Sequence, residues 1–108
     1  MDTPIQKDLD SIVREINNLL PEAKVYLFGS YASGTQQEDS DLDLCVVVPR
    51  LHDRRMEIVY NIRCAIDDLT KLPMDILLYT TDEFERNSRL RPTLQYTISQ
   101  KGVLLNGR

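Results

Sequence analysis

The sequence has few of the residues that build metal clusters, disulfide frameworks or flexible linkers. Its 108 residues include no tryptophan, one histidine, two cysteines and four glycines. The cysteines, Cys45 and Cys64, both lie within apolar patterns, and together with a single histidine they are too few for a structural zinc site or a disulfide scaffold. We therefore interpret both cysteines as small buried thiols of a reduced, cytosolic protein.

Long apolar runs and an excess of positive charge are also missing. The apolar runs are too short to span a bilayer, and the polar N-terminus does not resemble a signal peptide. Thirteen basic side chains against 17 acidic ones give a net charge of -4, which disfavours direct nucleic-acid binding because such proteins usually carry a basic face. We expect a cytoplasmic protein without membrane contacts, folded as a single domain over residues 1–108.

The hydrophobic pattern alternates between helical and strand periods along the chain. A first helix is expected to begin at Thr3-Pro4, where threonine caps and proline takes the first helical position, and to end before Pro21. The pattern predicts strands at Val25–Phe28, Leu42–Val48, Met74–Tyr79 and, at a sheet edge, Val103–Leu105. It predicts further helices at Ser30–Gly34, at Asp53–Thr70, from a capping box at Thr80 and Glu83, and at Leu94–Gln100. This order predicts the α/β (α+β) class, with helices flanking a small mixed sheet.

The segment from Gly29 to Gly34 follows one predicted strand and precedes a predicted short helix. Gly29 has no Cβ, so the backbone can turn sharply there and a ligand can approach it closely. The N–H groups of the following turn and the hydroxyl of Ser30 are suitable donors to phosphate oxygens. Taken alone, the Gly29-Ser30 pair is more typical of an ordinary strand-to-helix turn.

Two aspartates follow this turn after ten intervening residues, at the start of the next predicted strand. Asp41 and Asp43 are two positions apart, so on a strand they point to the same side. Two neighbouring carboxylates repel each other, and a Mg²⁺ ion between them removes that repulsion because hard cations prefer oxygen ligands. The alternative is a solvated acidic turn, since Glu38 and Asp39 lie just upstream.

A third aspartate, Asp75, lies in the otherwise apolar strand predicted at Met74–Tyr79. A carboxylate in such a strand needs a polar partner or a metal ion, unless it lies at a strand end that is exposed to water. If this strand pairs beside Leu42–Val48, Asp75 joins Asp41 and Asp43. Three carboxylates can hold two metal ions, and Asp75 can also accept the proton of an attacking hydroxyl.

The combined pattern of Gly29-Ser30, Asp41-x-Asp43 and a separate Asp75 resembles the nucleotidyltransferase superfamily of DNA polymerase beta type. The short chain and the preceding helix are similar to its smallest members, the minimal nucleotidyltransferases. The resemblance implies transfer of a nucleoside monophosphate from a nucleoside triphosphate to a hydroxyl, with pyrophosphate leaving. It implies that Gly29 and Ser30 bind the triphosphate, that the three aspartates bind Mg²⁺, as two ions, and that Asp75 is the general base.

The resemblance also implies a protein partner, and the sequence departs from the family pattern at one position. Minimal nucleotidyltransferases often pair with a helical HEPN-type toxin and act as its antitoxin, which implies that ATP is the substrate and a tyrosine hydroxyl of the toxin the acceptor of AMP. Many relatives carry arginine where this chain has Ser33, so one positive charge near the phosphates is missing. Two alternatives therefore stay open: a non-catalytic module that neutralises its partner by contact, and a nucleotidyltransferase acting on a small molecule.

Overall fold

The computed structural model describes residues 5–37, 40–90 and 93–106. The helices of these residues are α1 (Ile5–Leu19), α2 (Ser30–Ser33), α3 (Arg55–Ile66), the 3-10 turn η1 (Asp67–Leu69), α4 (Thr81–Asn87) and α5 (Leu94–Lys101). The strands are β1 (Lys24–Phe28), β2 (Leu42–Val48), β3 (Met74–Thr80) and β4 (Val103–Leu104). The predicted α/β class and element order are confirmed, whereas the predicted helix start at Thr3-Pro4 lies outside the described residues.

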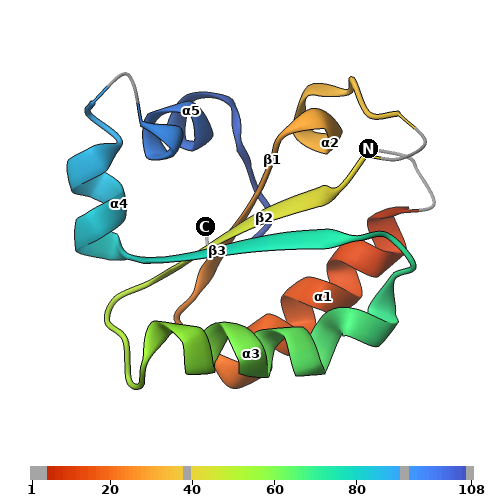
Figure 1. Ribbon diagram of the computed structural model, residues 1–108, viewed down its shortest axis with the longest axis horizontal. Helices are drawn as coiled ribbons and strands as arrows, with labels where there is room; N and C mark the ends of the chain where they lie inside the picture. Colours follow the sequence, from red (N-terminus) through yellow and green to blue (C-terminus); the bar gives the residue numbers. More distant parts are fainter. Residues whose placement is uncertain (1–4, 38–39, 91–92, 107–108) are drawn as a thin grey trace.

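The four strands form one mixed sheet in the order β3-β2-β1-β4 (Figure 1). β1 runs antiparallel to both β2 and β4, and β2 runs parallel to β3. The parallel pair requires a crossover, which α3 provides. The register places Phe28 opposite Asp43 and Asp43 opposite Asp75, so the predicted pairing of the two aspartate-bearing strands is confirmed.

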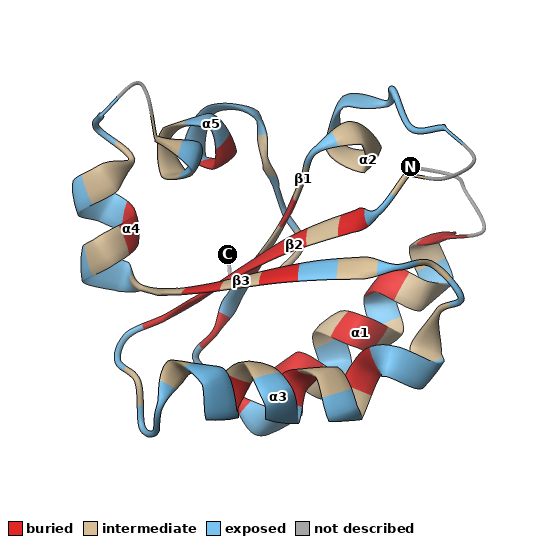
Figure 2. Ribbon diagram, in the orientation of Figure 1, coloured by how far each residue is buried: buried red, intermediate tan, exposed pale blue. Residues whose placement is uncertain are grey.

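Helices α1 and α3 cover one face of the sheet (Figures 1 and 2). The buried residues of α1 and α3 recur at helical spacing and form one apolar stripe on each helix. They pack against alternate residues of β2, namely Leu42, Leu44, Val46 and Val48. Within the described part of the chain, no helix has the length and apolar character needed to cross a bilayer.

A second, smaller core lies on the opposite face of the sheet. It joins Cys45 and Val47 of β2 to Phe84 of α4 and Ile98 of α5. The ring of Tyr26 stacks on Phe84 with a centroid distance of 5.3 Å. Cys45 is the buried thiol that the sequence predicted. Burial raises its pKa to about 12, which disfavours the reactive thiolate.

The central helix differs from its prediction in two respects. It begins at Arg55 rather than Asp53, and it ends at Ile66 rather than Thr70 because Asp67–Leu69 tighten into a 3-10 turn. Cys64, predicted to be buried, is exposed. It lies two positions from each of Ile62 and Ile66, which face the core, and two positions correspond to about 200° around a helix.

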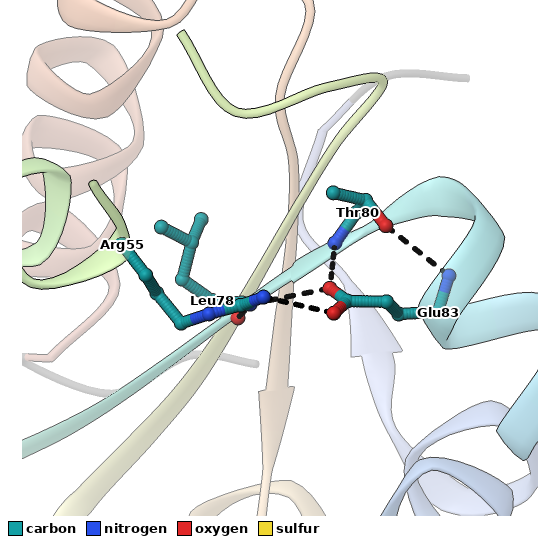
Figure 3. Close-up of polar contacts among 4 residues, drawn as sticks. All are labelled: Arg55, Leu78, Thr80 and Glu83. Atoms are coloured by element: carbon teal, nitrogen blue, oxygen red, sulfur yellow. Dashed lines mark hydrogen bonds and ion pairs between the residues drawn. The ribbon is translucent and has the colours of Figure 1, made fainter. Parts of the chain in front are cut away.

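The capping box predicted at the start of α4 is confirmed (Figure 3). The backbone N–H of Glu83 donates to the Thr80 hydroxyl at 3.2 Å, and the N–H of Thr80 donates to the Glu83 carboxylate at 2.8 Å. Arg55 at the start of α3 forms an ion pair with Glu83 at 2.8 Å and also donates to the carbonyl of Leu78. This network ties α3 and α4 to the outer edge of β3.

The C-terminal segment is held to the rest of the fold by two asparagines. The side chain of Asn106 accepts the backbone N–H of Val25 at 2.7 Å and donates to the side chain of Asn17 at 2.6 Å. It also donates to the carbonyl of Ala23 at 3.1 Å. These bonds fix the segment after β4 against α1 and the start of β1.

Candidate active site

The turn between β1 and α2 lies directly against the second aspartate. Gly29 has φ +77° and ψ -154°, a conformation that side chains other than hydrogen rarely allow. A Cβ atom at Gly29 would lie 2.1 Å from a carboxylate oxygen of Asp43. Glycine is therefore required here both by the backbone angle and by the close approach of Asp43.

Hydroxyl groups hold the short helix that follows the turn. Ser33 donates to the carbonyls of Gly29 and Ser30, at 3.3 Å each, and its oxygen lies 2.8 Å from that of Thr35. Gly34 ends the helix in the left-handed conformation, with φ +77°. Ser33 is thus a structural residue of the turn, a role that its position in the sequence did not indicate.

Asp43 and Asp75 lie side by side at the same end of the sheet. They are register partners on the parallel strands β2 and β3. Burial raises the pKa of the Asp43 carboxyl group, and the negative charges of Asp75 and then Asp41 raise it further. Asp43 is half-buried, and Asp41 and Asp75 are exposed. The strand register therefore brings Asp43 and Asp75 together, while Asp41 lies just before β2 and Asp75 also meets solvent.

The chemistry of this acidic end suits a divalent cation. A carboxylate that is partly buried beside like charges favours a bound cation, and carboxylate oxygens are the donors that Mg²⁺ prefers. Among the residues with described placement, no three His, Cys, Asp or Glu side chains are already arranged around one metal position. Asp43 and Asp75 are therefore the part of the site that the backbone brings together, and Asp41, just before β2, adjoins it.

Apolar side chains border the carboxylates on the same face of the sheet. Phe28 is the register partner of Asp43 on β1, and Leu77 lies two residues beyond Asp75 on β3. Both pack against the second core around Cys45. Neither Phe28 nor Leu77 stands out in the sequence, because only the strand register places them beside the carboxylates. An apolar surrounding of this kind strengthens electrostatic interactions at a half-buried carboxylate such as Asp43.

The chain belongs to the nucleotidyltransferase domain family, whose model matches residues 9–104. The family assignment agrees with the resemblance drawn from Gly29-Ser30 and the aspartates.

One curated relative is the protein adenylyltransferase MntA of Shewanella oneidensis strain MR-1, which is 32% identical over 65 residues. The matched stretch covers 57% of this chain and 47% of that protein, so it spans about half the length of the relative.

Solved structures share the fold at lower sequence identity. A chain in the crystal structure of a toxin-antitoxin with AMP-PNP superposes with a TM-score of 0.61 at 24% identity, covering 92% of this chain and 73% of that one. A chain in the structure of tri-AMPylated Shewanella oneidensis HEPN toxin in complex with MNT antitoxin gives a TM-score of 0.55 at 21% identity, covering 95% and 72%. The arrangement of sheet and helices is therefore that of the nucleotidyltransferase fold.

Proposed function

We propose that this protein is a Mg²⁺-dependent nucleotidyltransferase that transfers AMP from ATP to a hydroxyl, on a tyrosine of a HEPN-type toxin, and so acts as an antitoxin. The observation that carries the proposal is the contact of the Gly29 turn with Asp43, which is itself the register partner of Asp75. The similarity to a protein adenylyltransferase supports AMP as the transferred group. The similarity to a chain of a complex with an AMPylated HEPN toxin supports the toxin as acceptor.

In this proposal each site residue has a defined task. Gly29 and Ser30 bind the triphosphate, and Asp41, Asp43 and Asp75 hold two Mg²⁺ ions. When bound, the metal supplies positive charge that offsets the charge of the triphosphate and of the leaving pyrophosphate. Asp75 is exposed, so an acceptor hydroxyl can reach its carboxylate.

In the proposed reaction the acceptor hydroxyl loses a proton and ATP loses pyrophosphate. The carboxylate of Asp75 accepts the hydroxyl proton while the hydroxyl oxygen bonds to the α-phosphorus of ATP. The bond between that phosphorus and the bridging oxygen breaks, and pyrophosphate leaves with the electron pair. Because ATP is the substrate, we place the reaction in the cytoplasm, within one catalytic domain formed by this chain.

The acidic pair provides the test of this function. With ATP, Mg²⁺ and the HEPN-type protein encoded beside this chain, Asp43→Asn is expected to reduce AMP transfer by about a hundredfold or more, because it removes a carboxylate that would hold the Mg²⁺ needed to offset the charge of the triphosphate. Asp67→Asn, which changes an exposed aspartate on η1, is the matched control and should react like wild type. Equal transfer by Asp43→Asn and wild type would refute the proposed catalytic role.

A non-catalytic binding module is the second candidate, and one observation favours it. Ser33 carries no charge toward the turn, and its hydroxyl is already bonded to the carbonyls of Gly29 and Ser30. The double substitution Asp41→Ala with Asp43→Ala separates the two functions. If this variant still protects cells from the toxin, neutralisation by contact is the better account.

A further inference from the structure

An apolar groove of about 540 Å³ runs between α3 and the outer edge of β3. It lies outside the carboxylate site. Its α3 wall includes Met56 and Tyr60, and its floor is Ile76 and Leu78 of β3. Met56 is 83% exposed and Tyr60 is 63% exposed, the two largest exposures among the large hydrophobic side chains described. Two large apolar groups left to solvent along one groove are typical of a docking surface.

Side chains already occupy part of the outer backbone edge of β3. The N–H of Leu42 donates to the carbonyl of Pro73 at 2.8 Å, and in a parallel pair the residues alternate between facing the neighbour and facing outward. Met74, Leu78 and Thr80 belong to the outward set. Arg63 donates to the carbonyl of Met74 at 3.1 Å, while the Leu78 and Thr80 groups bond to Arg55 and Glu83 (Figure 3).

These side-chain bonds decide what kind of segment the groove accepts. An added strand needs a continuous row of free backbone groups along the edge. Three of the four outward residues on β3, Met74, Leu78 and Thr80, already have one backbone group bonded to a side chain, which interrupts that row. A helix satisfies its own backbone groups and needs only an apolar surface, so the groove fits an amphipathic helix rather than a strand.

The charge around the groove specifies the flanks of that helix. Arg55 and Arg63 line the groove together with the single carboxylate of Glu83. The ion pair of Arg55 with Glu83 is the one found among residues 5–37, 40–90 and 93–106, so Arg63 has no carboxylate partner in that part of the chain. The groove is thus locally positive in a chain of net charge -4, and acidic residues complement it.

The groove is continuous with the carboxylate site along β3. Ile76, in its floor, directly follows Asp75, and Leu77 contributes to the groove while pointing to the same face as Asp75. A segment bound in the groove therefore lies beside the carboxylate that we assign as general base.

We propose that the groove between α3 and β3 docks an amphipathic helix of the acceptor protein, with an apolar stripe flanked by acidic side chains. This inference rests on the proposed function, because it assigns the surface through which the AMP acceptor is held. Met56 and Tyr60 contact the apolar stripe, and Arg63 pairs with an acidic residue beside it.

Binding and transfer are measured separately on the full chain with the HEPN-type protein encoded beside it as the probe. Met56→Glu combined with Tyr60→Glu should weaken the complex in titration calorimetry by about tenfold or more. Val103→Glu is the matched control, since Val103 is 40% exposed on β4 at the opposite edge of the sheet, and it should bind like wild type. Asp43→Asn should bind like wild type while losing AMP transfer, so failure of docking and failure of catalysis give different results.

Two further measurements test whether the bound helix carries acidic side chains and whether it binds in this groove. Met56→Lys should weaken the complex less than Met56→Glu, because lysine attracts the acidic partner and glutamate repels it. Cys64 is exposed on α3 and lies one helical turn after Tyr60, on the same side of the helix, so complex formation should slow its alkylation several-fold. The proposal is overturned if the double glutamate variant binds like wild type, or if Met56→Lys binds more weakly than Met56→Glu. It is also overturned if the wild-type protein forms no complex, or if a dimer of this chain occupies the groove instead.

Discussion

At the scale of single residues, the site depends on the contact between Gly29 and Asp43. The sequence suggested a glycine for a sharp turn, and the structure adds that the space for a side chain is already filled by the Asp43 carboxylate. The aspartates could be selected from the sequence because carboxylates rarely enter apolar strands without a reason. The structural role of Ser33 could not be predicted, because it depends on which carbonyls the α2 turn presents to its hydroxyl.

Gly29→Ala is expected to damage both stability and activity. The new methyl group strains a left-handed residue, at a cost of roughly 1–3 kcal/mol, and displaces the Asp43 side chain. A misplaced catalytic group of this kind lowers transfer by about a hundredfold. Chemical denaturation and the AMP-transfer rate measure the two effects.

Gly34→Ala is the matched control for this substitution. Gly34 has the same φ of +77°, but no atom lies within 4 Å of the position of an added Cβ. It should therefore lose about 1 kcal/mol of stability and retain most of its transfer rate. An equal loss of transfer in both variants would show that backbone strain, rather than the contact with Asp43, is responsible.

At the scale of elements, local patterns predicted most helices and strands, and the exceptions have local causes. Helical periodicity predicted α3, whose buried residues are Ile58, Ile62 and Ile66, but such a pattern does not show that Asp67–Leu69 tighten into a 3-10 turn. The capping box of Thr80 and Glu83 was predictable because its spacing is fixed. Its extension to Arg55 was not, because Arg55 lies 28 residues earlier in the chain.

This capping network makes stability depend on pH. The hydrogen bond from Arg55 and, next, the backbone N–H of Thr80 hold the pKa of the Glu83 carboxyl group below its usual value. A lowered pKa means that Glu83 stabilises the fold above the unfolded glutamate pKa of about 4.3, and that this contribution is lost as the pH falls through the folded value.

Glu83→Gln tests this dependence. Because the pair is partly exposed, the variant should be less stable than wild type by about 0.5–1 kcal/mol near neutral pH. This difference in the free energy of unfolding should disappear at acidic pH, once Glu83 of the wild type is protonated. Urea denaturation at several pH values measures it, and Glu85→Gln, an exposed change on the same helix, is the control. A difference that stays constant with pH would contradict the ionic role of Glu83.

At the scale of the whole molecule, the site exists because strands far apart in the sequence become neighbours. Asp43 and Asp75 meet only through the parallel pairing of β2 and β3. From the sequence, the two aspartates were expected to meet only if these strands were neighbours. The sequence could not establish that pairing, since strand order depends on the whole fold. The bonds of Asn106 to Asn17 and Val25 and the groove beside β3 are likewise products of tertiary structure. Neither shows a local sequence pattern.

The central claim is that the carboxylate site at this end of the sheet transfers AMP, and the position of a radiolabel tests it most directly. The chain is incubated with Mg²⁺, the HEPN-type protein encoded beside it, and ATP labelled at either the α- or the γ-phosphate. We expect the partner to retain the α-label and not the γ-label, and chelation of the metal to abolish labelling. Retention of the γ-label, or α-labelling that is unchanged in Asp43→Asn, would contradict the account.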